Sequence, residues 1–518
     1  MQLTRSLVRA RRIQGTRTCL VFGARRWTWA QHVERIARLA AGLLELGVRP
    51  GERVAVLSHS SDRYMEIAFA ILWAGGVLVP LSPRATPQEL ASTLADSDAT
   101  LLFISDDFVP FLADLRAAVP ALARVVHAGD GETCPDCVDY ERLIIDHGEA
   151  ERVLRGGSDL AAIYYTGGTT GQPKGVMLSH ANLYANSVHS LAHFRYDERT
   201  VYLHAGPLHH LAAGSRIFTS AIVGATQVVI PRFSPQEVLD AIETHKVTMT
   251  SLVPTMMSML LNHPRFHSAD LSSLDLITYG ASSMPEALIA EFLERLPHVR
   301  FAQAYGMTEL SPACTYLEPR HHTLDSSRRH LLRSAGRPAL GVDVRIVDPQ
   351  DHDLPIGEVG EIVVAGPVVM QGYWKQPELT AVALRGGYMH TGDMGRMDVD
   401  GFLYVVDRLK DMIVSGGENV YSAEVEDAVR RHPDVALCAV IGIPHPVWGE
   451  AVHAVVVLRA GALACEQDII AHCRTLISAY KVPRTVEFRD EMPLTAANKI
   501  QKAVLRHPFW EGRARNVN

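Results

Sequence analysis

The chain has 518 residues, of which 47% are hydrophobic and 21% are charged. This length predicts roughly three structural units, and the composition excludes a disordered chain or a small disulfide scaffold. The 50 basic and 57 acidic residues give a formal net charge of −7, which excludes the basic footprint of a general nucleic-acid-binding protein.

The N-terminal segment is rich in arginine, with seven arginines before the first acidic residue, Glu34. Such a start can belong to a transit peptide. However, Leu3, Leu7 and Val8 predict a first helix, and residues 20–22 predict a strand of the fold. We therefore expect a cytoplasmic protein.

Residues 67–81 form the longest apolar run, which Gly75 and Gly76 interrupt. Because the run is shorter than the roughly 18 residues that span a bilayer, it predicts a buried helix followed by a strand and no membrane span. Seven cysteines without a signal peptide indicate a reducing compartment. Cys134 with Cys137, and His263 with His267, lack further ligands nearby. We expect surface loops there and no zinc.

Predicted helices and strands alternate along the first 278 residues. The helices cover residues 27–46, 63–73, 87–94, 235–245 and 255–262. The strands cover residues 54–57, 77–80, 100–104, 160–163, 227–230, 248–252 and 274–278. This alternation is typical of parallel sheets with crossover helices, so we expect an α/β fold.

The pattern changes after about Gly341. Short strands at 344–347, 360–364 and 402–406, separated by Gly and Pro, predict a small antiparallel β subdomain. The last hundred residues predict a compact α+β domain. Its predicted elements are helices at 423–431 and 466–477 and strands at 436–442, 452–458 and 485–488. In the second helix Ile469, Ile470, Cys473, Leu476 and Ile477 fall on one face, which should cover a small sheet.

Residues 164–175 read YYTGGTTGQPKG and contain four glycines, three threonines and a lysine. Backbone N–H groups, hydroxyls and a cation are the groups that enclose a polyphosphate. Pro173 before Lys174 and Gly175 after it exclude the pattern of P-loop nucleoside triphosphatases. The segment therefore predicts a phosphate-binding loop of another kind.

Five further motifs follow in order, and together they carry a family resemblance. They are YGMTE at 305–309, TGD at 391–393, DRLKD at 407–411, GGENV at 416–420 and NKI at 498–500. With the loop at 164–175, the sequence resembles the adenylate-forming superfamily, which includes acyl- and aryl-CoA ligases, firefly luciferase and the adenylation domains of peptide synthetases. The resemblance spans nearly the whole chain.

The resemblance implies a two-step activation of a small carboxylic acid. A carboxylate resists attack by a thiol, so it is first joined to AMP from ATP as a mixed anhydride and then transferred to CoA. Charge that develops on the phosphates needs Mg²⁺, a lysine and backbone N–H groups. We therefore expect ATP, Mg²⁺ and CoA as cofactor and co-substrates. Carrier-protein loading, a luciferase-like oxygenase and a non-catalytic nucleotide-binding protein remain alternatives.

The resemblance also assigns roles to individual residues. Glu309 should hold Mg²⁺, Thr308 should contact phosphate, and Lys499 should bridge the acyl carboxylate and the α-phosphate. His210, in the segment PLHH, should lie near the acyl carboxylate or the pantetheine entrance. The nucleotide should contact Thr166, Gly167, Gly168, Thr169, Thr170, Gly171, Lys174, Gly280, Ala281, Ser282, Tyr305, Gly306, Asp393 and Arg408.

Two positions depart from the family pattern. Asn498 stands where the family usually has Gly, and Gly167 stands where Ser is commoner. Neither change removes a charged group. Asn tolerates left-handed backbone angles better than most residues, so the first change is mild.

The same resemblance implies a domain movement between the two steps. We expect an N-terminal domain over 1–406, made of parallel-sheet α/β subdomains and a small β subdomain. A hinge at 407–410, centred on Lys410, would connect it to a small mobile C-terminal domain over 411–518. Gly416 and Gly417 would let CoA approach the backbone.

Residues near the motifs limit which carboxylic acids the protein could accept. Residues 211–214 are apolar and contain no Asp, which disfavours an amino acid, and the uncharged Ala304 disfavours a small dicarboxylate. Met256, Met257, Met259 and Leu260 could line an acyl pocket, but their helical spacing favours simple core packing. An uncharged aliphatic or aromatic acid remains. Whether the protein is a monomer or a homodimer stays open.

Overall fold

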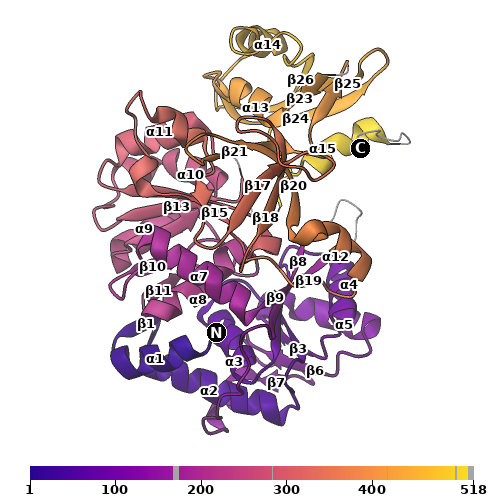
Figure 1. Cartoon of the computed structure of the whole chain (residues 1–518). Coiled ribbons are helices and arrows are strands. Elements are labelled where there is room, and N and C mark those ends of the chain that lie inside the picture. The colour runs from indigo at the N-terminus through magenta and orange to yellow at the C-terminus, as the bar shows by residue number, and fades with distance from the viewer. Residues whose placement is uncertain (167–173, 283, 417, 496–498, 512–518) are drawn as a thin grey trace.

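The computed structural model describes residues 1–166, 174–282, 284–416, 418–495 and 499–511. The described strands form four sheets. In Figure 1 the C-terminal unit, coloured light orange to yellow, lies above the rest of the chain, which carries the two large sheets. The architecture is the expected α/β fold with a small α+β unit at the end of the chain.

One large sheet has eight strands in the order β19-β9-β8-β4-β3-β5-β6-β7. These are β3 (Arg53–Leu57), β4 (Val77–Pro80), β5 (Leu101–Ile104), β6 (Arg124–His127), β7 (Val138–Asp139), β8 (Leu160–Thr166), β9 (Lys174–Ser179) and β19 (Gly372–Tyr373). The associated helices are α2 (Trp29–Glu45), α3 (Asp62–Trp73), α4 (Pro87–Ser97), α5 (Leu112–Ala118) and α6 (Tyr140–Ile145). Strands β3 to β8 pair in parallel, and β3, β4, β5 and β8 are the strands that the sequence predicts. Strands β9 and β19, which the sequence did not predict, pair antiparallel at one edge.

The other large sheet has nine strands in the order β16-β15-β14-β13-β12-β10-β11-β1-β2. These are β1 (Thr18–Phe22), β2 (Arg25–Thr28), β10 (Val201–His204), β11 (Thr226–Val229), β12 (Met249–Leu252), β13 (Leu276–Gly280), β14 (Arg300–Tyr305), β15 (Thr315–Leu317) and β16 (Arg337–Pro338). Its helices are α1 (Arg5–Gln14), α7 (His180–Phe194), α8 (Leu211–Val223), α9 (Pro235–His245), α10 (Pro254–Leu261) and α11 (Glu286–Arg295).

Two smaller sheets complete the chain. The antiparallel sheet β17-β18-β20-β21 comprises Asp343–Val347, Gly360–Ala365, Met389–Met397 and Leu403–Arg408. Helix α12 (Pro377–Ala383) precedes β20 in the chain. The C-terminal sheet comprises β22 (Ile413–Ser415), β23 (Glu418–Val420), β24 (Val435–His445), β25 (Gly449–Leu458) and β26 (Thr485–Phe488). Its helices are α13 (Ser422–Arg430), α14 (Glu466–Arg474) and α15 (Lys502–Trp510).

The long apolar run of the sequence is confirmed as a buried helix and strand. Every residue from 64 to 80 is buried, and α3 ends before a tight turn to β4. Gly75 makes this turn at φ +80°, where an added Cβ would lie 2.7 Å from Cγ1 of Val153. Among the described residues, no helix is long and apolar enough to cross a membrane.

Three side chains differ from expectation. Helix α14 ends at Arg474, so Leu476 falls outside the helix and is 41% exposed instead of covering the sheet. Met259 is 49% exposed on α10, whereas Met256 and Met257 pack in the core, as their spacing favours. Val8 is exposed on α1, because the buried face of that helix carries Ser6, Leu7 and Ala10.

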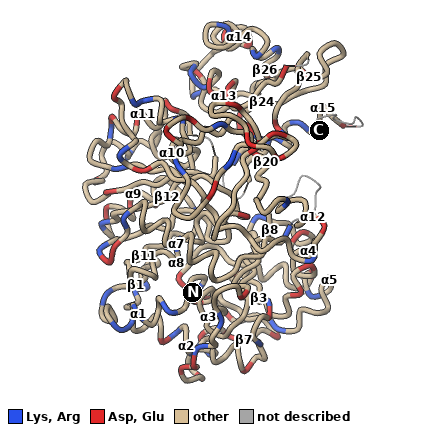
Figure 2. Tube along the Cα trace, in the orientation of Figure 1, with Lys and Arg blue, Asp and Glu red and all other residues tan. Residues whose placement is uncertain are grey.

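The cysteines are distributed between one disulfide and five free thiols. Cys134 and Cys137 form a disulfide, although the sequence suggested a reducing environment. The other cysteines are free, and among them only Cys465 is exposed. Figure 2 shows basic and acidic residues interspersed along the coloured part of the Cα trace, without a long run of basic residues there.

Candidate active site

The phosphate-binding loop lies between two paired strands. Thr166 ends β8 and pairs antiparallel with Lys174, the first residue of β9. Gly167, Gly168, Thr169, Thr170 and Gly171 lie outside the described residues. The strand pairing therefore fixes only the two ends of the predicted loop, and it places the Lys174 cation at one of them.

Glu309 and Lys174 both lie next to the Tyr373 side chain. The Glu309 carboxylate is 5% exposed and accepts a hydrogen bond of 2.9 Å from the Tyr373 hydroxyl. The Lys174 ammonium lies 5.4 Å from the centroid of the Tyr373 ring. Burial raises the pKa of Glu309, against the opposing effects of the Tyr373 hydrogen bond and of Lys174 and Arg408. A buried carboxylate of this kind suits a bound cation.

Tyr305, Asp393 and Arg408 form a second group beside the first. Tyr305 ends β14 and donates a hydrogen bond of 2.8 Å to Asp393 on β20. Arg408, directly opposite Asp393 in the β20–β21 ladder, places its Nε 3.5 Å from the other carboxylate oxygen. Burial raises the pKa of Asp393, while Arg408, Tyr305 and Lys499 oppose the shift. The sequence predicted all three residues.

The backbone has unusual dihedral angles directly after β13 and directly after β14. Ala281 has φ +67° and Gly306 has φ +157°. An added Cβ on Gly280 would lie 2.2 Å from the carbonyl oxygen of Ala304, and one on Gly306 would lie 2.4 Å from that of Pro312. The backbone of β13 and β14 thus comes close at the predicted adenine site, where only glycine fits. Ser282 is exposed.

Lys499 projects from a short hairpin of the C-terminal unit. Leu494 and Ile500 form an isolated antiparallel bridge, and Thr495 N–H donates a 2.7 Å hydrogen bond to the Lys499 carbonyl. Asn498 lies outside the described residues. Burial and the nearby Arg408 lower the pKa of Lys499 to about 8, against the opposing charge of Asp393. The hairpin therefore brings Lys499 to the Asp393–Arg408 pair.

His210 approaches the same place from the N-terminal side. It immediately precedes α8, and burial together with the positive charges of Lys499 and Arg84 lowers its pKa to about 4. The ring is therefore neutral at physiological pH. Its Nε2 is buried and has no hydrogen-bond partner among the described residues. A neutral imidazole with a vacant nitrogen can donate to, or accept from, a bound ligand.

Thr308 begins a short 3₁₀ helix (Thr308–Leu310) directly after Gly306 and Met307. This turn carries Glu309 inward from the end of β14, beside Thr308. Thr308 and Glu309 thus lie close to Tyr305, with which they share a motif.

The predicted hinge lies where β21 ends. Asp407 accepts a hydrogen bond of 3.0 Å from the Ser422 hydroxyl at the start of α13, and Arg506 of α15 pairs with Asp411 at 2.9 Å. Lys410 is exposed in the turn that follows β21. The chain is therefore bound into the C-terminal unit on both sides of Lys410.

Gly416 and Gly417 were predicted to contact CoA. Gly416 is exposed at φ +64°, and an added Cβ would lie 2.6 Å from Cε3 of Trp448. Gly417 lies outside the described residues. Nearby, Lys481 is already paired with Glu424 at 2.7 Å.

Sequence reasoning missed Tyr373 and Arg84. Tyr373 lies on β19, a strand of two residues without a motif, and reaches Glu309 only through the sheet pairing of β19 with β9. Arg84 follows β4 and donates a 2.8 Å hydrogen bond to the Thr495 carbonyl. The dipeptide Pro83-Arg84 gave no signal, because its partner lies more than 400 residues away in sequence.

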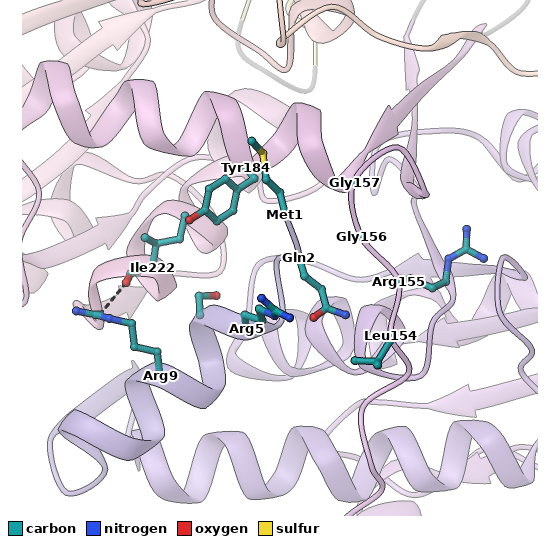
Figure 3. Close-up of a pocket in the computed structure, with 11 residues that line it drawn as sticks. Met1, Gln2, Arg5, Arg9, Leu154, Arg155, Gly156, Gly157, Tyr184 and Ile222 are labelled. Carbon is teal, nitrogen blue, oxygen red and sulfur yellow. Dashed lines mark hydrogen bonds between the residues drawn. The ribbon is translucent and has the colours of Figure 1, made fainter.

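A separate cavity of about 440 Å³ lies near the N-terminus, between α1, residues 154–157 and Tyr184 (Figure 3). Arg9 there donates to the Ile222 carbonyl at 3.0 Å, and Arg155 pairs with Asp159. None of the predicted site residues lines it. Over the described part of the chain, no cluster of three or more His, Cys, Asp or Glu could hold a metal.

Comparisons with known proteins match nearly the whole chain. The model of the AMP-binding enzyme family matches residues 8–374, and that of the AMP-binding enzyme C-terminal domain matches residues 424–499. A feruloyl-CoA synthase of an Amycolatopsis species is 42% identical, covering 97% of this chain and 98% of the relative. An indoleacetate–CoA ligase of Aromatoleum aromaticum is 37% identical, covering 98% of each. The ATP-bound crystal structure of MatB from Rhodopseudomonas palustris is 30% identical, with a TM-score of 0.89 over 98% of this chain and 99% of that one.

Proposed function

Because the chain belongs to the AMP-binding enzyme family, we propose that the residues described above carry out the two half-reactions of an AMP-forming acid–thiol ligase. The protein is an acyl- or aryl-CoA ligase that uses ATP and CoA. The convergence of Lys499, Asp393 and Arg408 beside His210 is the observation that carries the assignment of roles.

In the first half-reaction the acid attacks the α-phosphate of ATP, and pyrophosphate leaves. Lys499 supplies positive charge between the acyl carboxylate and the α-phosphate, and Lys174 with the loop at 167–171 would hold the leaving phosphates. Asp393 accepts the ribose hydroxyls, and Tyr305 packs its ring against adenine while its hydroxyl holds Asp393.

Glu309 is the residue that would hold Mg²⁺. Its buried carboxylate, which accepts a hydrogen bond from the Tyr373 hydroxyl, fits a cation that also binds substrate phosphates. When bound, Mg²⁺ supplies positive charge that stabilises the negative charge developing on the phosphates. Thr308 would contact the same phosphates.

In the second half-reaction the C-terminal unit turns about Lys410, so Lys499 leaves and CoA enters. Asp407 and Asp411 both contact the C-terminal unit, through α13 and α15, so the residues on either side of Lys410 would move with that unit. Gly416 and Gly417 would then face the pantetheine thiol. The thiol attacks the acyl carbonyl and AMP leaves.

For the acid, we propose an uncharged carboxylic acid with an aromatic group. His210 and the apolar residues 211–214 at the start of α8 provide no acidic partner for a substrate ammonium. We also propose a cytoplasmic location, which immunodetection in cell fractions would test.

The test is formation of AMP and acyl-CoA from ATP, Mg²⁺, CoA and a panel of aryl and fatty acids. With at least one aryl acid, we expect AMP and acyl-CoA thioester to form in equal amounts. A protein that forms acyl-AMP but transfers it only to a carrier-protein phosphopantetheine would contradict the assignment of free CoA as acceptor. No AMP with any acid would contradict adenylation itself.

A further inference from the structure

The inference concerns a buried group of charged side chains that links the predicted hinge to the hairpin of Lys499. Lys502 is the first residue of α15 and lies three residues after Lys499. Its ammonium donates a 2.7 Å hydrogen bond to the Ser422 hydroxyl and lies 2.7 Å from a carboxylate oxygen of Glu426. Both partners belong to α13. Helix α15 is therefore fixed to α13 at its first residue.

Ser422 extends this link to the hinge. Its hydroxyl donates a 3.0 Å hydrogen bond to Asp407, and its backbone N–H donates another to the second carboxylate oxygen. Asp407 pairs with Met394 in the β20–β21 ladder, so its backbone belongs to the sheet that carries Asp393. A continuous path of hydrogen bonds therefore runs from β21 through Ser422 to Lys502.

The Lys502 ammonium compensates carboxylates that are costly to bury. Asp407 is 7% exposed and Glu426 is 5% exposed. Burial raises the pKa of Asp407, and Lys502 has the largest opposing effect. Burial by itself lowers the pKa of Lys502, but Glu426, Asp407 and Asp411 outweigh this effect and raise it. Loss of the ammonium would leave two interacting buried carboxylates with less compensation, which strains the link between hinge and helix.

The hairpin and α15 pack on the same part of the C-terminal sheet. Leu505 of α15 lies in a buried cluster with residues of β24 and β25, and Leu494 and Ile500 of the hairpin pack against that cluster. Only Gln501 separates Ile500 from the start of α15. The position of α15 therefore sets the position of the hairpin and of Lys499.

We propose that Lys502 is a positioning residue for the adenylation half-reaction. It ties the start of α15 to the hinge at Asp407, and thereby holds the hairpin where the Lys499 ammonium reaches the nucleotide site. This inference rests on the proposed function and deepens it, because it assigns the placement of Lys499 to a group outside that site. Misplacing a catalytic group by a small distance can reduce a rate about 100-fold, so the loss of this tie should be measurable.

The main test is the Lys502→Met variant, which keeps most of the side-chain length without the charge. The kcat for pyrophosphate release from ATP and acid without CoA should fall at least about tenfold. The KM for ATP should stay within about twofold, because Asp393 and Arg408 are unchanged. Thioester formation from supplied acyl-adenylate and CoA should stay within about threefold of the wild-type rate, because Lys499 takes no part in that step.

Two matched variants show whether the charge and its location matter. Lys502→Arg keeps the charge and should recover most of the lost rate, and no recovery would contradict a role for the charge. Lys481→Met removes a lysine whose side chain is 17% exposed, against 19% for Lys502, and which pairs with Glu424 of α13 at 2.7 Å. Because that pair joins α13 to the residues before β26 and not to α15, pyrophosphate release should be unchanged.

Hydrogen exchange measures the hairpin without depending on activity. The N–H groups of Thr495 and Lys499 are hydrogen-bonded within the hairpin. They should exchange faster in Lys502→Met than in the wild type and in Lys481→Met.

A milder variant replaces Lys502→Met if that protein fails to fold, as its thermal melt would show. Ser422→Ala removes only the hydroxyl between Lys502 and Asp407. It should slow pyrophosphate release about threefold, and an unchanged rate would contradict the proposal.

Three results with folded Lys502→Met would overturn the proposal. They are an unchanged rate of pyrophosphate release, an equal loss of both half-reactions, and unchanged exchange in the hairpin. Failure of the proposed function instead gives no pyrophosphate from the wild type with any acid. Hairpin exchange still reports the effect of Lys502 in that case, so the two failures are distinguishable.

Discussion

The guanidinium of Arg84 donates a 2.8 Å hydrogen bond to the carbonyl of Thr495, which joins the large N-terminal part of the chain to the hairpin that carries Lys499. Thr495 in turn holds Lys499 through two hydrogen bonds, one from its own N–H and one to its hydroxyl. Arg84 therefore supports the arrangement in which Lys499 reaches the nucleotide site. We expect this contact to be lost when the C-terminal unit turns for the second half-reaction.

Arg84→Ala should slow adenylation selectively. Losing one exposed hydrogen bond that favours one of two conformations should reduce pyrophosphate release without CoA about three- to tenfold. Arg116→Ala is the matched control, because Arg116 also donates a 2.8 Å hydrogen bond to a backbone carbonyl, that of Asp136, but within the N-terminal part. Equal rates for both variants would contradict a positioning role for Arg84.

Tyr305→Phe should weaken ATP binding. Without the 2.8 Å hydrogen bond, the Asp393 carboxylate is less well fixed for the ribose, so the KM for ATP should rise about three- to tenfold while the adenine-facing ring remains. Tyr404→Phe removes a comparable tyrosine–aspartate contact, that with Asp398 at 3.2 Å, and should leave this KM unchanged. Steady-state kinetics with varied ATP measure both.

Adenylation should decline in alkaline solution. Because the pKa of Lys499 is lowered to about 8, the ammonium is lost as the pH rises through that value. The kcat/KM for ATP, which reports the free enzyme, should therefore be half its maximum near pH 8 and fall above it. The guanidinium in the Lys499→Arg variant keeps its positive charge over the whole pH range. This variant should therefore not show the decline, even if its activity is lower. A wild-type profile flat to pH 10 would argue against a buried lysine cation in the reaction.

Glu309→Gln should raise the requirement for Mg²⁺. The amide oxygen can still accept from Tyr373, but the negative charge is gone, so we expect turnover to fall about 100-fold and the half-saturating Mg²⁺ concentration to increase. Glu318→Gln, which alters a carboxylate paired with His193, serves as the control. An unchanged Mg²⁺ titration would remove Glu309 from the metal site.

Much of the fold could be predicted because strand and helix periods differ clearly in this chain. Helix α9 begins and ends where the sequence predicts, since Ser234 and Pro235 mark its start and the left-handed Lys246 its end. Leu476 was predicted wrongly because apolar spacing continues past Arg474 although the helix stops there. Periodicity reports which residues could share a face and not where hydrogen bonding ends.

The site residues within motifs could be predicted, whereas those reached only through tertiary pairing could not. Tyr305, Asp393 and Arg408 lie in motifs and converge as expected. Tyr373 and Arg84 depend on β19–β9 pairing and on the placement of the Lys499 hairpin.

The most direct test of the central claim separates the half-reactions in Lys499→Ala. Pyrophosphate release from ATP and acid should fall at least about 100-fold, because the charge that stabilises the transferring phosphate is removed. Thioester formation from supplied acyl-adenylate and CoA should stay within about threefold of the wild-type rate, because in that step the C-terminal unit has turned and Lys499 has left. Equal loss of both rates would contradict the account.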